Sequence, residues 1–251
     1  MDPAEYANLD RVERHHWYYA GKRELVRWWL ARLGALGAER VLLDCGAGTG
    51  RFALEMQSHC RVLVLDDHEE ALTLLRARFS DEQVLTLRDG QIPLAEQTLD
   101  VVTALDVLEH VGPHEAAVEG FHRVLKPGGL ALVTVPASMA LWSDWDVALH
   151  HHRRYDRRQL CGLFRAEQWE ILHVNYTNVV VFPAVWMIRR WRAWFPRRKL
   201  NQTAATRAED RVPPEWLNRL LRFLFVALGK SRVPFPFGVS LLLVARKRAP
   251  G

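Results

Sequence analysis

The amino-acid sequence predicts an α/β protein with a doubly wound, mostly parallel sheet of seven strands, N-terminal helices and a helical insertion before the last strand. Two observations lead to this prediction. Short and almost entirely apolar segments alternate with amphipathic ones, which is typical of parallel strands covered by helices on both faces. The chain also has 251 residues, 49% of them hydrophobic, which is enough for one large core.

The first part of the chain contains five expected strands, with helices between most of them. An amphipathic helix is expected at 22–36, before the first strand. Lys126-Pro-Gly-Gly129 is a strong helix breaker, so the helix before the fifth strand should end there. The expected strands are 41–45, 61–66, 83–87, 100–105 and 130–135, and the helices between them are 51–58, 68–79 and 114–125.

Beyond residue 140 the repeats give way to a different pattern. We expect a helix at 157–167, a strand at 169–176 and a last strand at 239–245. The sequence between these two strands reads as a helical insertion with a polar, mobile stretch at 197–214. Four segments are therefore predicted: an N-terminal helical lid at 1–38, a core at 39–176, a helical cap at 177–237, and the last strand with a basic tail at 238–251.

A glycine-rich turn follows the first strand, in the run Val41-Leu-Leu-Asp-Cys-Gly-Ala-Gly-Thr-Gly50. Glycines allow the backbone to approach a ligand closely. A dinucleotide fingerprint counted from Gly46 would need glycine where Arg51 stands, and counting from Gly48 gives only a looser form that ends in Ala53. The sequence also lacks a phosphate-binding P-loop. A tight turn without any ligand is the simpler alternative.

The pattern Asp44-x-Gly-x-Gly-x-Gly resembles motif I of the class I S-adenosylmethionine-dependent methyltransferases. This resemblance implies that S-adenosylmethionine is the cofactor and that Asp44, Gly46, Ala47 and Gly48 bind it. In doubly wound folds, an acid about 20 residues beyond the glycine turn accepts the ribose hydroxyls. Asp66 stands at that distance from Gly46, and Asp67 is expected to share the role.

Two later segments extend this resemblance along the cofactor site. It implies that Asp89, followed by Gly90, accepts a hydrogen bond from the adenine amino group, although Asp-Gly turns also form for local reasons. In the segment 104–111, Leu105 would pack near the adenosine or methionine part, and His110 is either a general base or a packing residue. The segment is not Asp-Pro-Pro-Tyr, which argues against amino-methylation of DNA without excluding RNA.

The stretches Arg14-His-His-Trp-Tyr-Tyr-Ala-Gly-Lys-Arg23 and Leu141-Trp-Ser-Asp-Trp-Asp146 resemble the bacterial type-11/type-12 methyltransferase group, as does His150-His-His-Arg-Arg-Tyr155. Related sequences have glycine in place of His150. His151 and Tyr155 follow the fifth strand and are candidate catalytic residues. The usual histidine pKa of about 6.5 suits a base, although His151 could also only order its loop. Neighbouring histidines do not converge on one ion, so no metal is expected.

Charge is distributed unevenly along the chain. Residues 1–152 carry 14 Lys/Arg and 23 Asp/Glu, whereas residues 153–251 carry 20 and 6. The basic part suggests an anionic partner, either nucleic acid or an anionic membrane, or else a solvated face. In the insertion, apolar residues 179–188 precede six cations and three aromatics at 189–199, which suits a peripheral membrane contact or a helical cap.

The chain has three widely spaced cysteines, an odd number, and its sequence shows no signal peptide and no membrane-spanning segment. These features predict a cytoplasmic protein, with contact at the inner membrane face as an open alternative. The sequence as a whole predicts a methyltransferase that acts on a small acceptor, either amphipathic or lipid-linked. An RNA methyltransferase that uses the basic C-terminal part and a non-catalytic S-adenosylmethionine-binding protein are alternatives. A nicotinamide oxidoreductase is disfavoured by the glycine spacing. The oligomeric state is left open.

Overall fold

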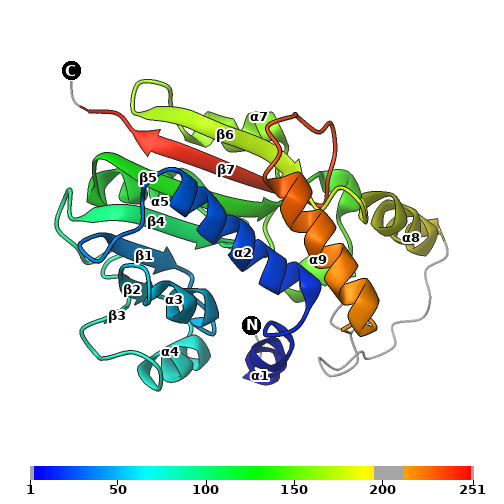
Figure 1. Cartoon of the computed structure of the whole chain (residues 1–251), viewed down its shortest axis with the longest axis horizontal. Coiled ribbons are helices and arrows are strands. Elements are labelled where there is room, and N and C mark those ends of the chain that lie inside the picture. The colour runs from blue at the N-terminus through cyan, green and yellow to red at the C-terminus, as the bar shows by residue number, and fades with distance from the viewer. Residues whose placement is uncertain (1–2, 195–211, 250–251) are drawn as a thin grey trace.

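The computed structural model describes residues 3–194 and 212–249 (Figure 1). The end of the basic run at 189–199 and most of the polar stretch at 197–214, both singled out in the sequence, lie outside the described residues. None of the helices in the described ranges combines the length and the apolar character that a bilayer crossing requires.

A single seven-stranded sheet forms the centre of the protein (Figure 1). Its strand order is β3-β2-β1-β4-β5-β7-β6, and only β7 runs antiparallel to its neighbours. This confirms the predicted fold class. The strands are β1 (Val41–Cys45), β2 (Arg61–Leu65), β3 (Val84–Leu85), β4 (Leu99–Leu105), β5 (Leu125–Pro136), β6 (Trp169–Thr177) and β7 (Ser240–Lys247).

The register of the parallel strands brings three strand ends to one edge of the sheet. Cys45, the last residue of β1, pairs with Leu65 on one side and Ala104 on the other. The residues that follow β1, β2 and β4 therefore meet at the carboxyl edge, where doubly wound folds bind ligands.

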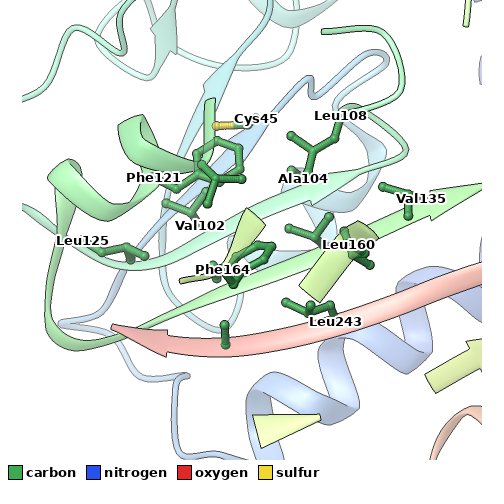
Figure 2. Packing of buried hydrophobic residues seen from close by; sticks show 14 of the residues in the cluster. Cys45, Val102, Ala104, Leu108, Phe121, Leu125, Val135, Leu160, Phe164 and Leu243 are labelled. Carbon is green, nitrogen blue, oxygen red and sulfur yellow. The ribbon is translucent and has the colours of Figure 1, made fainter. Parts of the chain in front are cut away.

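Helices cover the sheet in two layers, each with its own apolar core. Figure 2 shows part of the first core, in which Phe121, Leu160 and Phe164 pack against the strands. The second core includes Trp29, Phe52 and Phe225. The helices are α1 (Pro3–Val12), α2 (Trp17–Arg32), α3 (Arg51–Met56), α4 (Glu69–Arg76), α5 (His114–Val124), α6 (Asp144–Ala148), α7 (Arg157–Leu163), α8 (Phe182–Trp194) and α9 (Glu215–Gly229).

Most predicted elements lie within a few residues of the observed ones, with two informative differences. Helix α2 begins five residues before the expected start, because the His16 side chain accepts a hydrogen bond from the Tyr18 N–H as an N-cap. It ends earlier because Gly34 adopts a left-handed conformation with φ +67°. Strand β5 begins at Leu125 rather than 130, since Leu125 pairs with Leu99 before an irregularity in the ladder.

Helix α9 belongs to the helical layer on the sheet, although the sequence placed it in a cap. It lies beside α2 (Figure 1), and its Phe225 and Val226 are buried. The two helices approach closely at glycines: a Cβ on Gly229 would overlap the Leu25 side chain, and one on Gly21 would lie 2.9 Å from Phe225 Cδ1. The insertion therefore contributes to the core as well as covering the carboxyl edge.

We expect Gly229→Ala to lower the free energy of unfolding by about 1–3 kcal/mol, because the new methyl group has no space beside Leu25. Gly162→Ala in α7 is the matched control. A Cβ there meets nothing within 4 Å, so alanine should stabilise the helix by about 0.5–1 kcal/mol. Urea denaturation measures both changes, and equal effects would contradict the close α2–α9 packing.

Candidate functional site

A cavity of about 1400 Å³ opens at the carboxyl edge of the sheet. Its walls come from the glycine turn after β1, the ends of β2 and β4, the loop after β5, and helices α1, α2 and α8. Most of the residues that the sequence proposed for the site line this cavity: Asp44, Gly46, Ala47, Gly48, Asp66, Asp67, Gly90, Leu105, His110 and His151.

The glycine turn is tied to the end of β2 by backbone hydrogen bonds. Gly46 N and Ala47 N donate to the Leu65 carbonyl at 2.8 and 3.1 Å. Gly46 has φ +65°, and a Cβ there would lie 2.5 Å from the Val107 side chain. Only glycine satisfies both the conformation and the space at this position.

Asp66 anchors the turn from the opposite side. Its carboxylate accepts hydrogen bonds from the backbone N–H groups of Gly48 at 2.9 Å, Asp67 at 2.9 Å and His68 at 3.1 Å. A carboxylate offers about four acceptor positions, so roughly one is left for a ligand hydroxyl. Asp67 is more exposed and accepts from Leu87 N at 3.1 Å, which leaves it further capacity. The two adjacent acids together can accept two hydroxyl groups.

Asp44 lies buried at the end of β1 and accepts a hydrogen bond from Thr103 Oγ1 at 2.8 Å. Burial raises the pKa of this carboxyl group to about 7, although the Thr103 hydrogen bond acts in the opposite direction. A cationic group placed beside it in the cavity would favour its ionised form.

Three side chains, those of Lys22, Tyr18 and Thr134, contact Asp106 directly after β4. The sequence alone did not predict these contacts. Lys22 Nζ from α2 lies 2.6 Å from Asp106 Oδ2, and Thr134 Oγ1 donates to Asp106 Oδ1 at 2.9 Å. The Tyr18 hydroxyl donates to Asp106 at 3.3 Å. Burial alone would raise the pKa of Asp106, but the Lys22 ammonium and the hydrogen bonds from Thr134 and Tyr18 together lower it. No sequence pattern connects residues so far apart, so this network was missed.

Two proposed site residues do not line the cavity. Asp89 is exposed in a turn with φ +51°, and only its neighbour Gly90 reaches the cavity wall. Tyr155 is buried, with its hydroxyl 3.0 Å from the Leu108 carbonyl and 2.7 Å from His114 Nδ1. The hydrogen bond to Leu108 thus connects the loop after β5 to the loop after β4.

His151 lies at the other end of the cavity, where Asp146 orients it. Its Nδ1 is 3.0 Å from Asp146 Oδ1, which also accepts from Arg154 Nε at 2.7 Å. Burial would raise the pKa of Asp146, but these partners lower it to about 2, so the carboxylate is ionised at neutral pH. An ionised partner at Nδ1 holds the proton there and leaves Nε2 of His151 as an acceptor. Arg189 of α8 approaches the same carboxylate at 3.5 Å.

His110 and Glu109 complete this end of the cavity. The His110 and His151 rings lie edge to face, with centroids 4.7 Å apart. Burial lowers the pKa of His110 to about 4, which makes it neutral at physiological pH. Burial also raises the pKa of Glu109 well above its ordinary range. The Glu109 carbonyl accepts from His152 N at 2.8 Å and so joins the two loops.

The wall between the two ends is largely apolar. Val181, which precedes α8, lines it with Val185 and Ile188 of α8 and Leu221 of α9. Trp17 and Tyr18 of α2 line the cavity too. The cavity thus combines polar side chains with a substantial apolar lining.

Residues 15–174 match the family model described as "Methyltransferase domain". A similar protein of Mycolicibacterium smegmatis, with the name "Probable S-adenosylmethionine-dependent methyltransferase", is 29% identical over 163 residues, covering 64% of this chain and 62% of that protein. The ubiquinone biosynthesis O-methyltransferase of Acinetobacter baylyi is 28% identical over 144 residues, covering 51% and 60%. The chain therefore spans about three fifths of the length of these relatives.

Solved structures share the fold at low sequence identity. A SAM-dependent methyltransferase of Thermotoga maritima superposes with a TM-score of 0.60 at 17% identity, covering 98% of this chain and 96% of that one. Phosphoethanolamine N-methyltransferase 2 of Haemonchus contortus, solved in complex with S-adenosyl-L-methionine, gives 0.54 at 17% identity, with coverage of 88% and 51%. With the family match over residues 15–174 and the glycine turn at the carboxyl edge, these likenesses show that the chain belongs to the class I S-adenosylmethionine-dependent methyltransferases.

Proposed function

We propose that this protein transfers a methyl group from S-adenosylmethionine to a small amphipathic or lipid-linked acceptor. One observation carries the proposal: the glycine turn with Asp66 and the loop with His151 open into the same cavity. A donor bound at one end and an acceptor bound at the other would meet inside it. Holding two reactants in line is the largest contribution that a protein makes to such a displacement.

At the donor end, the chain's residues fit the cofactor's chemical groups. Asp66 and Asp67 would hold the two ribose hydroxyls, and Gly90 and Leu105 would line the adenosine side, with Asp89 in the adjoining turn. The ionised form of Asp44 would be favoured by the cofactor's ammonium group. Bound S-adenosylmethionine supplies an electrophilic methyl group on a sulfonium.

At the acceptor end, we assign His151 and His110 to the reacting atom, because both line the cavity there. Asp146 fixes the orientation of the His151 ring. Tyr155 does not reach the cavity, and we assign it a positioning role through its hydrogen bond to the Leu108 carbonyl. These assignments revise the sequence-based prediction, in which Tyr155 stood beside His151 as a candidate for chemistry.

The apolar wall supports an amphipathic acceptor. Val181 and, on α8, Val185 and Ile188 offer no polar side-chain group to a ligand, so they favour an aliphatic or aromatic body. One relative is named for ubiquinone biosynthesis, and we infer an acceptor of comparable amphipathic character for this chain.

We further propose that α8 and α9 contact an anionic membrane surface. Trp216, Leu220 and Phe223 follow one outer face of α9, and Trp216 and Phe223 are 68% and 67% exposed. Trp191 on α8 is 65% exposed. Residues 212–249 carry seven Lys/Arg and one Asp/Glu. Exposed aromatic side chains among cations favour a lipid headgroup layer over nucleic acid.

The first test concerns the donor end. We expect Asp66→Asn to weaken S-adenosylmethionine binding about 10- to 100-fold, because it removes a charged hydrogen-bond acceptor and loosens the glycine turn. Asp81→Asn, an exposed acid with no role in the cavity, is the control. Isothermal titration calorimetry measures both, and an unchanged affinity for Asp66→Asn would refute the assignment.

The second test concerns the acceptor end. His151→Ala should reduce methyl transfer on the order of 100-fold while S-adenosylmethionine affinity stays within about twofold of the wild type. The assay follows labelled methyl groups from the cofactor into a polar-lipid extract. A normal rate in the variant would show that His151 only orders its loop. If the wild-type protein labelled no lipid, the proposed acceptor class would be contradicted.

The third test concerns the membrane. The wild-type protein should float with vesicles that contain phosphatidylglycerol and should dissociate at high salt, because screening weakens the attraction between arginines and anionic headgroups. The double change Trp216→Ser and Phe223→Ser should reduce flotation, whereas Ile171→Ser on β6 should not. If neither high salt nor the two changes in α9 reduced flotation, this result would argue against membrane contact through α8 and α9.

A further inference from the structure

Three metal-ligating side chains converge at the acceptor end of the cavity. One ligand atom each from Glu109, His110 and His151 lies within 4.8 Å of the other two. Glu109 and His110 follow β4, whereas His151 follows β5, so two separate loops supply the group. All three residues line the cavity.

The carboxylate of Glu109 is the second observation that indicates a ligand. Glu109 is 1% exposed, and neither of its carboxylate oxygens has a hydrogen-bond partner among the described residues. Nearby cations are occupied, since Lys22 binds Asp106 and Arg154 binds Asp146 and the Ala137 carbonyl. A buried polar group without a partner is costly, and a bound ion is one of the few arrangements that compensates for it.

His151 is oriented as a metal-binding histidine would be. The Asp146 carboxylate faces Nδ1 at 3.0 Å, so Nε2 is the nitrogen with a free lone pair. A histidine that binds a metal almost always donates its other ring N–H to a carboxylate, a backbone carbonyl or water, and Asp146 is such a partner.

We propose that Glu109, His110 and His151 bind a divalent transition-metal ion whose remaining coordination positions face the cavity. Two imidazoles and one carboxylate suit zinc, iron, manganese or cobalt, and they leave positions for an oxygen ligand. The sequence predicted no metal because consecutive histidines do not converge. That argument holds for His150 and His152, but it did not foresee partners on another loop.

The catalytic consequence rests on the proposed methyl transfer and names the accepting atom. An acceptor hydroxyl that occupies an open position on the ion has a lowered pKa, because the ion stabilises the oxyanion. Its O–H bond breaks and the proton leaves to water. The oxygen then forms a bond to the methyl carbon while the carbon–sulfur bond breaks, which yields a methyl ether or ester and S-adenosylhomocysteine.

The test is a calorimetric titration of Zn²⁺ into the full chain after treatment with a chelator. We expect one tight site per chain in the wild type. Glu109→Gln and His110→Asn should each weaken that site about 100-fold, since even loss of a supporting partner costs 10–100-fold. The matched control is His150→Gly, which removes the neighbouring imidazole at a backbone position with φ +57° that glycine tolerates. It should bind zinc as the wild type does.

Two further measurements separate loss of the site from loss of the fold. Zinc should raise the Tm of the wild type and of His150→Gly, and should leave the Tm of Glu109→Gln unchanged. S-adenosylmethionine titration in the presence of chelator reports the donor end independently. The metal proposal is overturned if the wild type lacks the tight site or if Glu109→Gln binds zinc equally well. In either case an intact S-adenosylmethionine affinity would leave the proposed methyl transfer standing.

Discussion

The parallel pairing of β1 with β2 and β4 is the constraint on which the rest of the structure depends. It places the ends of the three strands at one edge, where Gly46, Asp66 and Asp106 meet within one cavity. The short backbone bonds from the glycine turn to the end of β2 follow from this pairing.

The donor end could be predicted from the sequence because its residues are local to strand ends. Asp44, the glycines and Asp66 each follow an apolar strand at a spacing that the fold enforces. The proposed acceptor end, around His151, could not be predicted from the sequence in the same way. Asp146 meets His151 and Arg154 within a loop of no regular period, and Lys22 reaches Asp106 from a helix far away in the chain. Such contacts depend on tertiary packing, which leaves no short-range pattern in the sequence.

The insertion, too, could be predicted only in part from the sequence. Its helical character followed from apolar periodicity, and α8 and α9 are both present. Its role as a separate cap did not hold for α9, because Phe225 and Val226 pack in the same core as Trp29. Apolar residues occupy both faces of α9, and the sequence alone cannot say which face meets the sheet. The buried Phe225 and Val226 and the glycine contacts at Gly21 and Gly229 identify the inner one.

Asp146 receives His151 and Arg154 from its own loop and Arg189 from α8. Because Asp146 contacts both groups, the position of α8 and the orientation of the His151 ring depend on the same carboxylate. If the proposed membrane surface and the proposed acceptor both bind, contacts of α8 and of the His151 ring with this carboxylate would couple the two events, and such coupling is reciprocal.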